Sequence, residues 1–126
     1  MPDVAAQAVP AERVLVVEDE FLLSMALEQD LLNGGFAVVG PYNSLQSAMD
    51  AIARESFSIA LVDMNLNGQL AFPLLDELLK RDAPLLIVSG YTEKDLPPRY
   101  RMLPRMAKPA EPRALLMAIR RILAAP

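Results

Sequence analysis

The chain has 126 residues, a net charge of −4 and 53% hydrophobic residues. This indicates one folded domain with a real core and argues against nucleic-acid binding. It has no cysteine and no histidine, which excludes disulfides, metal sites built on either residue, a Ser-His-Asp triad and a phosphohistidine on this chain. No apolar stretch approaches the ~18 residues that span a bilayer. We expect residues 1–11 to form a flexible tail without a secretory signal, followed by a domain over 12–126.

Strand and helix patterns alternate from the start of this domain. Val14–Val17 is a continuous apolar run, typical of a strand that is covered on both faces. A helix is predicted over Phe21–Asn33, where Gly34-Gly35 supplies its C-terminal cap. A second strand is predicted over Phe36–Val39, closed by the turn-forming pair Gly40-Pro41.

A second helix is predicted behind Ser44, a suitable N-cap residue. Apolar residues behind it recur at the spacing of one helical face. They are Leu45, Ala48, Met49 and Ile52. A third strand over Ser58–Val62 leads into a loop over residues 65–68. The next helix runs to about Lys80, with Pro73 in its first turn, where proline is tolerated.

The C-terminal part repeats the alternation less clearly. Leu85–Val88 predicts a fourth strand, and the prolines that follow leave room for at most a short helix near Thr92–Leu96. Arg105–Ala107 is a short fifth strand, and Glu111-Pro112 opens the last helix. This order predicts a doubly wound α/β domain, with a parallel sheet, right-handed crossovers and helices on both faces.

Polar side chains stand where four of these strands end. Glu18 and Asp19 follow the first strand, Asp63 the third, Ser89 the fourth and Lys108 the fifth. Because the carboxyl ends of parallel strands share one edge of the sheet, we expect these groups to converge there. Clustered carboxylates raise one another's pKa unless a cation compensates them, and Mg²⁺ prefers such oxygen ligands. The pattern therefore suits a magnesium ion and a phosphoryl group.

Each of these residues also has a simpler interpretation. Acids follow strands because loops are solvated and helices favour acidic N-caps, a serine before glycine is most often part of a turn, and most lysines are solvated. Pro109 favours a functional role for Lys108, since proline restricts the backbone conformation of the residue before it. Arg99, Arg101 and Arg105 form either a basic surface for a partner or a solvated loop. The chain has no glycine-rich phosphate loop and no dinucleotide fingerprint.

Over roughly residues 12–124 the chain resembles the receiver domains of two-component response regulators. The resemblance rests on the pair Glu18-Asp19, on Asp63 in the segment Val-Asp-Met-Asn-Leu-Asn-Gly, on Ser89 after a strand, and on Lys108-Pro109. It implies a stand-alone receiver with a flavodoxin-like (β/α)5 fold, a five-stranded sheet in the order 2-1-3-4-5 and a short or irregular fourth helix.

The resemblance also implies roles for the site residues. Asp63 is the acceptor of a phosphoryl group that comes from the phosphohistidine of a sensor histidine kinase or a histidine phosphotransfer protein. Lys108 and Ser89 hold the phosphoryl oxygens. The implied ligands of Mg²⁺ are Asp19, Asp63 and the backbone carbonyl of Asn65, with Glu18 nearby. The bond between Lys108 and Pro109 is expected to be cis.

The chain departs from the common family pattern at three places. Glu18 stands where most receivers have aspartate, and Arg105 stands where most have the aromatic switch residue. The segment that ends in Ser89-Gly90-Tyr91 partly resembles a subclass with a Pro-Phe-x-Phe-Ala-Thr-Gly-Tyr motif, found mostly in alphaproteobacteria. Because an unpaired buried charge is costly, we expect Tyr91 rather than Arg105 to move in the switch.

The sequence therefore predicts a cytoplasmic, phosphoryl-accepting signalling switch. It would catalyse only its own phosphorylation and dephosphorylation, and its output would come through a downstream target protein, without nucleic acid or membrane insertion. One alternative is a pseudo-receiver that binds partners without phosphorylation. Another is a magnesium-dependent phosphohydrolase with an aspartyl-phosphate intermediate, although its second aspartate would stand where Asn65 is. A flavodoxin-like cofactor binder is disfavoured, because the chain is short and lacks a hydroxyl-rich phosphate loop.

Overall fold

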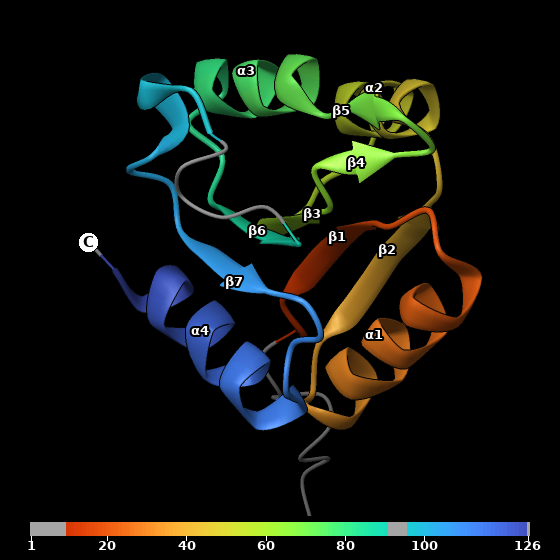
Figure 1. Cartoon of the computed structure of the whole chain (residues 1–126). Helices are drawn as coiled ribbons and strands as arrows, with labels where there is room; N and C mark the ends of the chain where they lie inside the picture. Colours follow the sequence, from red (N-terminus) through yellow and green to blue (C-terminus); the bar gives the residue numbers. More distant parts are fainter. Residues whose placement is uncertain (1–9, 91–95, 126) are drawn as a thin grey trace, which may run out of the picture.

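A five-stranded parallel sheet runs through the middle of the computed structural model, which describes residues 10–90 and 96–125 (Figure 1). Its strands lie in the order β2-β1-β3-β6-β7. They are β1 (Arg13–Val17), β2 (Ala37–Tyr42), β3 (Ile59–Val62), β6 (Leu85–Ser89) and β7 (Arg105–Ala107). Numbered along the chain, this order is the predicted 2-1-3-4-5, so the predicted fold class is confirmed.

Helices cover both faces of this sheet. α1 (Phe21–Asn33) and α4 (Pro112–Ala124) lie on one face, while α2 (Leu45–Arg54) and α3 (Phe72–Lys80) lie on the other (Figure 1). The predicted bounds of α1 are confirmed. Ser44 caps α2 as predicted, because its hydroxyl accepts a hydrogen bond from the Ser47 N–H at 3.1 Å.

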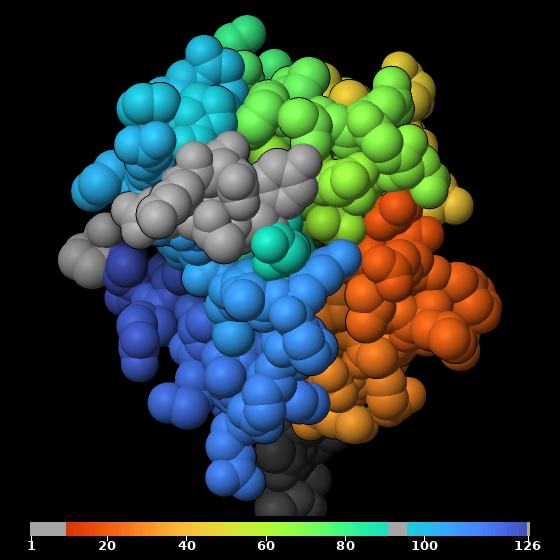
Figure 2. Space-filling view, in the orientation of Figure 1, coloured from red at the N-terminus to blue at the C-terminus, as the bar shows by residue number. Residues whose placement is uncertain are grey.

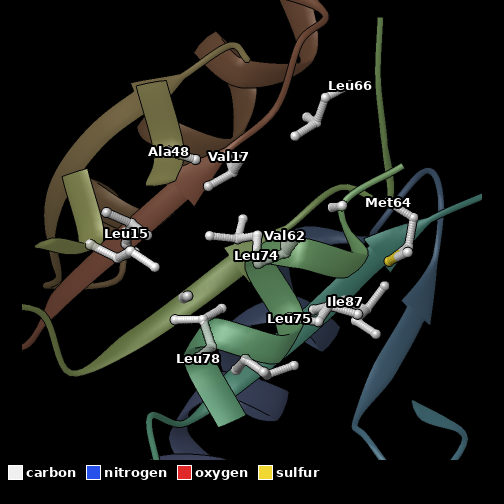
Figure 3. Close-up of a cluster of buried hydrophobic side chains, with 14 of the residues drawn as sticks. Leu15, Val17, Ala48, Val62, Met64, Leu66, Leu74, Leu75, Leu78 and Ile87 are labelled. Atoms are coloured by element: carbon white, nitrogen blue, oxygen red, sulfur yellow. The ribbon is translucent and has the colours of Figure 1, made fainter. Parts of the chain in front are cut away.

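The sheet separates two buried clusters of apolar side chains. The cluster under α2 and α3 joins inward-facing residues of the strands to residues of these two helices (Figure 3). Its members include Leu15, Val17, Ala48, Val62, Leu74, Leu75, Leu78 and Ile87. The second cluster joins the other sides of the same strands to Leu31 of α1 and to Leu115 and Ile119 of α4. Burial on both faces is the reason why these strands appear as continuous apolar runs.

Strand β2 is longer than the sequence predicts. The prediction ended it at Val39, but the strand continues through Gly40 and Pro41 to Tyr42. Gly40 allows this because its φ is +101°, and a Cβ atom there would lie 2.8 Å from the Tyr42 ring. The Tyr42 carbonyl accepts a hydrogen bond from the Glu18 N–H at 2.9 Å. The extension therefore fixes the backbone at the first acidic residue.

The predicted loop over residues 65–68 is part of a β-hairpin. β4 (Asn65–Leu66) pairs antiparallel with β5 (Gln69–Leu70), and Asn67 and Gly68 form the two-residue turn between them. Both turn residues have positive φ, +55° and +87°, the conformation for which Asn-Gly is favoured in tight hairpins. The hairpin directly follows β3, so it lies at the carboxyl edge of the sheet.

The segment before β7 packs against α3 through the side chain of Tyr100. The predicted helix near Thr92–Leu96 falls mostly on residues 91–95, outside the described ranges, and the segment after it contains a 3-10 turn at Pro98–Tyr100. The Tyr100 side chain is fully buried, and its ring stacks on Phe72 at 5.0 Å between centroids. Its hydroxyl donates a hydrogen bond to Asp76 Oδ1 at 2.6 Å.

We expect the Tyr100 ring to contribute more to stability than its hydroxyl. Tyr100→Ala should lower the free energy of unfolding by about 3–5 kcal/mol, because it leaves a cavity against Phe72. Tyr100→Phe should cost only about 1 kcal/mol, because Asp76 keeps its ion pair with Arg99 at 3.0 Å. Urea titrations measure both values. Met102→Ala, at a side chain that is 91% exposed, is the control. Equal losses in the two Tyr100 variants would contradict the prediction.

Candidate functional site

Four loops meet at the carboxyl edge of the sheet and surround an open cavity of about 720 Å³. They are the segments that follow β1, β3, β6 and β7, which adjoin one another as orange-red, green, teal and blue atoms on the face seen in Figure 2. The cavity is lined by Asp19, Glu20, Asp63, Asn65, Asn67, Gly68, Ser89, Gly90 and Lys108. Glu18 does not line this cavity but contacts Lys108, which does. The structure thus brings together the five groups that were predicted to converge.

The ammonium group of Lys108 is shared by two buried carboxylates. Its Nζ atom lies 2.9 Å from Glu18 Oε1 and 2.9 Å from Asp63 Oδ2. Glu18 is 2% exposed and Asp63 is 5% exposed. The remaining oxygens accept backbone hydrogen bonds, Glu18 Oε2 from the Glu20 N–H at 3.0 Å and Asp63 Oδ1 from the Asn65 N–H at 3.3 Å. Both buried acids are therefore paired, as buried charges must be.

This pairing does not remove the cost of ionising Asp63. Burial raises its pKa most, the charge of Glu18 adds to the rise, and the bonds from Lys108 and Asn65 offset only part of it. The pKa of Asp63 is thereby raised from 3.8 to about 6. Burial works against the charge of Lys108, but its bonds to Asp63 and Glu18 outweigh burial and raise the pKa of Lys108 above its usual value.

Asp19 is held by the hairpin rather than by the lysine. Its Oδ2 accepts a hydrogen bond from the Asn67 N–H at 3.0 Å. Partial burial alone would raise the pKa of Asp19, but this bond and others from neighbouring groups lower it below its usual value. The role of Asn67 in binding Asp19 was not predicted from the sequence. The Asn-Gly dipeptide was the signal that could have revealed it, because it favours a hairpin turn at this place.

The three acids form a group that could hold a metal ion. One carboxylate oxygen from each of Glu18, Asp19 and Asp63 lies within 4.8 Å of the others. A donor set made only of oxygens fits a hard divalent cation, and three carboxylates close together favour a cation electrostatically. Asn65, whose backbone carbonyl is the further ligand implied by the resemblance, lines the same cavity.

Ser89 and Lys108 are placed by the pairing of the last two strands. Ser89 is 2% exposed at the end of β6, opposite Ala107 of β7. Its carbonyl accepts a hydrogen bond from the Lys108 N–H at 3.1 Å. The peptide bond between Lys108 and Pro109 is cis, which confirms the prediction.

The arginines near β7 hold the backbone of their own segment. Arg105 Nη1 donates to the carbonyls of Arg101 at 2.8 Å and Leu103 at 3.3 Å. Arg101 Nε donates to the Leu96 carbonyl at 2.9 Å. These bonds favour a structural role over a basic surface for a partner. Tyr91, the residue predicted to move in the switch in place of Arg105, lies outside the described residues.

Comparison with known sequences finds response regulators. The chain is 34% identical over 116 residues to the response regulator protein FleR of Pseudomonas aeruginosa, a match that covers 88% of this chain and 24% of FleR. It is 28% identical over 112 residues to the transcriptional regulatory protein PdtaR of Mycobacterium tuberculosis, with 88% of this chain and 55% of PdtaR covered. The chain thus spans about a quarter of the length of FleR and about half of the length of PdtaR. No protein-family model matches it.

Solved structures give the same result at the level of the fold. The REC domain of the response regulator PhyR from Erythrobacter litoralis superposes with a TM-score of 0.80 at 27% identity, over 92% of this chain and 95% of that domain. SdrG from Sphingomonas melonis superposes with a TM-score of 0.79 at 26% identity, over 93% and 100% of the two chains. In the part of the chain that the structure describes, no helix is long and apolar enough to cross a membrane.

We expect Asp63→Asn to stabilise the protein at neutral pH. Because the pKa of Asp63 is raised from 3.8 to about 6, the folded state keeps a proton in this window that the unfolded chain has lost. Stability therefore falls as pH rises through the window, and asparagine avoids that loss. The gain should be on the order of 1–2 kcal/mol above pH 6 and vanish near pH 4.

Thermal or urea unfolding of both proteins across this pH range measures the effect. Asp50→Asn on the exposed face of α2 removes the same charge away from the site, and it should show no such pH dependence. A loss of stability in Asp63→Asn at neutral pH would mean that the pairing with Lys108 outweighs burial, against this prediction.

Proposed function

The chain belongs to the receiver domains of response regulators, and on this premise we propose that it accepts a phosphoryl group on Asp63 in two-component signalling. The observation that carries the proposal is the position of Asp63 at the wall of the cavity, with the Lys108 ammonium 2.9 Å from its Oδ2 atom. Phosphoryl transfer depends mainly on alignment and on neutralising charge, and this pair of residues supplies both.

Asp63 acts as the nucleophile. With a pKa raised to about 6, its carboxylate is largely ionised at neutral pH. One of its oxygens bonds to phosphorus while the bond from phosphorus to the donor's histidine nitrogen breaks. The Asn65 N–H and Lys108 both bind the carboxylate and so fix its orientation before the donor arrives. Orientation in advance lowers the entropic part of the barrier.

Lys108 and Ser89 receive the incoming oxygens. Lys108 can keep its contact with Glu18 while its ammonium neutralises a phosphoryl oxygen at Asp63, since Glu18 Oε1 lies 2.9 Å from the same Nζ atom. Ser89, at the end of the neighbouring strand, lines the same cavity and can donate its hydroxyl hydrogen. Asp19, Asp63 and the Asn65 carbonyl would hold Mg²⁺, which supplies further neutralisation of the phosphoryl oxygens when it is bound.

The donor in this proposal is a sensor histidine kinase or a histidine phosphotransfer protein, because the chain has no histidine of its own. The receiver catalyses only its own phosphorylation and dephosphorylation, so no separate substrate is turned over. A cytoplasmic location, phosphorelay and output through a downstream target protein belong to the same proposal.

The experiment that tests the proposal is phosphorylation by a small acyl phosphate in the presence of Mg²⁺, followed by intact-mass measurement. The wild-type chain should gain one phosphoryl group, and Asp63→Ala should gain none. Asp50→Ala, which removes an exposed carboxylate on α2 away from the site, should be labelled like the wild type. If Asp63→Ala is labelled, the phosphoryl group is accepted by a residue other than Asp63. No labelling of any protein would favour the pseudo-receiver, which binds partners without phosphorylation.

We expect Asp19 and Glu18 to differ in their effect on Mg²⁺ binding. Asp19→Asn should weaken binding more, by roughly tenfold or more, because Asp19 lines the cavity and is not paired with the lysine. Glu18→Gln should weaken it less, because both oxygens of Glu18 already accept hydrogen bonds. Calorimetric titration with Mg²⁺ gives the affinities, with Asp50→Asn as a charge-matched control. A larger loss in Glu18→Gln than in Asp19→Asn would contradict this order.

A further inference from the structure

The chain contains two Asn-Gly dipeptides in different surroundings, Asn33-Gly34 and Asn67-Gly68. Asparagine followed by glycine is the pair most prone to deamidation, because glycine has no side chain that hinders attack by its own backbone nitrogen. The attack requires that this nitrogen loses its proton and reaches the Cγ atom of the asparagine. Hydrogen bonds that hold the glycine N–H therefore decide how fast each asparagine reacts.

Asn33-Gly34 is held by the end of a helix. The Gly34 N–H donates to the backbone carbonyls of Asp30 at 3.0 Å and Leu31 at 3.1 Å. Gly34 also packs closely against Leu116 of α4, where a Cβ atom would lie 2.5 Å from the leucine side chain. Both the hydrogen bonds and the packing keep this glycine nitrogen from approaching the Asn33 side chain.

Asn67-Gly68 is held more weakly. The Gly68 N–H donates to the side-chain Oδ1 of Asn65 at 2.8 Å, and all three residues are exposed. Apart from Gly68 and its two chain neighbours, nothing lies within 4 Å of the place where a Cβ of Gly68 would be. A bond to an exposed side chain opens by a single rotation, whereas a bond to a helix carbonyl opens only when the helix end unwinds.

We propose that Asn67 is a site of spontaneous deamidation, and that the amide oxygen of Asn65 slows the reaction by holding the Gly68 N–H. In the reaction the Gly68 nitrogen gives its proton to solvent base and bonds to Asn67 Cγ. Nδ2 takes a proton from water, the bond from Cγ to Nδ2 breaks, and ammonia leaves. Water then opens the resulting succinimide, which leaves either aspartate or isoaspartate at position 67.

The product would alter the candidate site directly. Asn67 lines the cavity, and its N–H binds Asp19 Oδ2 at 3.0 Å. The new carboxylate therefore arises near three carboxylates, two of which, Glu18 and Asp63, share the Lys108 ammonium group. Isoaspartate also adds one methylene to the backbone of a two-residue turn. The pairing of Leu66 with Gln69 across that turn cannot keep its register with the longer chain.

Peptide mapping of the full chain after incubation in mildly alkaline buffer tests the proposal. In the folded protein Asn67 should deamidate several-fold faster than Asn33, and an isoaspartyl methyltransferase should label the peptide around position 67. In denaturant the two rates should converge. Equal rates in the folded chain, or a faster reaction at Asn33, would overturn the proposal without any variant.

Variants test the protective bond separately. Asn65→Ala should increase the rate at Asn67 several-fold and leave Asn33 unchanged, whereas Asn65→Asp, which keeps an acceptor oxygen, should stay close to the wild-type rate. Gln69→Ala is the control for a change at the exposed hairpin that leaves the Asn65 bond in place. An unchanged rate at Asn67 in a folded Asn65→Ala protein would show that this bond does not protect.

Discussion

Two buried carboxylates share a single ammonium group, and the edge of the sheet is organised around that arrangement. Lys108 lies 2.9 Å from both Glu18 and Asp63. Either acid alone with the lysine would form a simple ion pair. Burial is the main reason why the pKa of Asp63 is raised to about 6, and the negative charge of the second acid, Glu18, adds to the rise. The site is therefore poised to gain stability from any cation or from a change that removes charge from Asp63.

Neighbouring backbone holds the acids in this unfavourable proximity. At the end of the longer β2, the Tyr42 carbonyl accepts a hydrogen bond from the Glu18 N–H. The Glu18 carboxylate accepts one from the Glu20 N–H, and in the hairpin after β3 the Asn67 N–H donates to the Asp19 carboxylate. The apolar clusters on both sides of the sheet fix the strands from which these groups project. Packing in the core thus compensates the unfavourable free energy of the clustered acids at the edge of the sheet, as is common at functional sites.

The strands, helices and strand order followed from apolar periodicity and from the family resemblance, because burial on both faces leaves a plain signal in the sequence. The predictions failed at two places, one where a local rule was overridden and one where a local rule was overlooked. Gly40 and Pro41 ordinarily end a strand, but a positive φ at Gly40 lets β2 continue. Residues 65–68 were predicted as a loop, although Asn67-Gly68 fits a hairpin turn. The meeting of Glu18, Asp63 and Lys108 was expected, but which acids the lysine would bind depends on side-chain distances that no sequence pattern contains.

A side-chain NMR titration of Asp63 in the metal-free protein tests most directly whether burial and shared pairing govern the site. The carboxyl carbon of Asp63 should titrate near pH 6 in the wild type, at higher pH in Lys108→Met, and at lower pH in Glu18→Gln, because these variants remove an attractive and a repulsive charge respectively. A midpoint near the usual 3.8, or one that neither variant moves, would contradict the shared-ammonium arrangement.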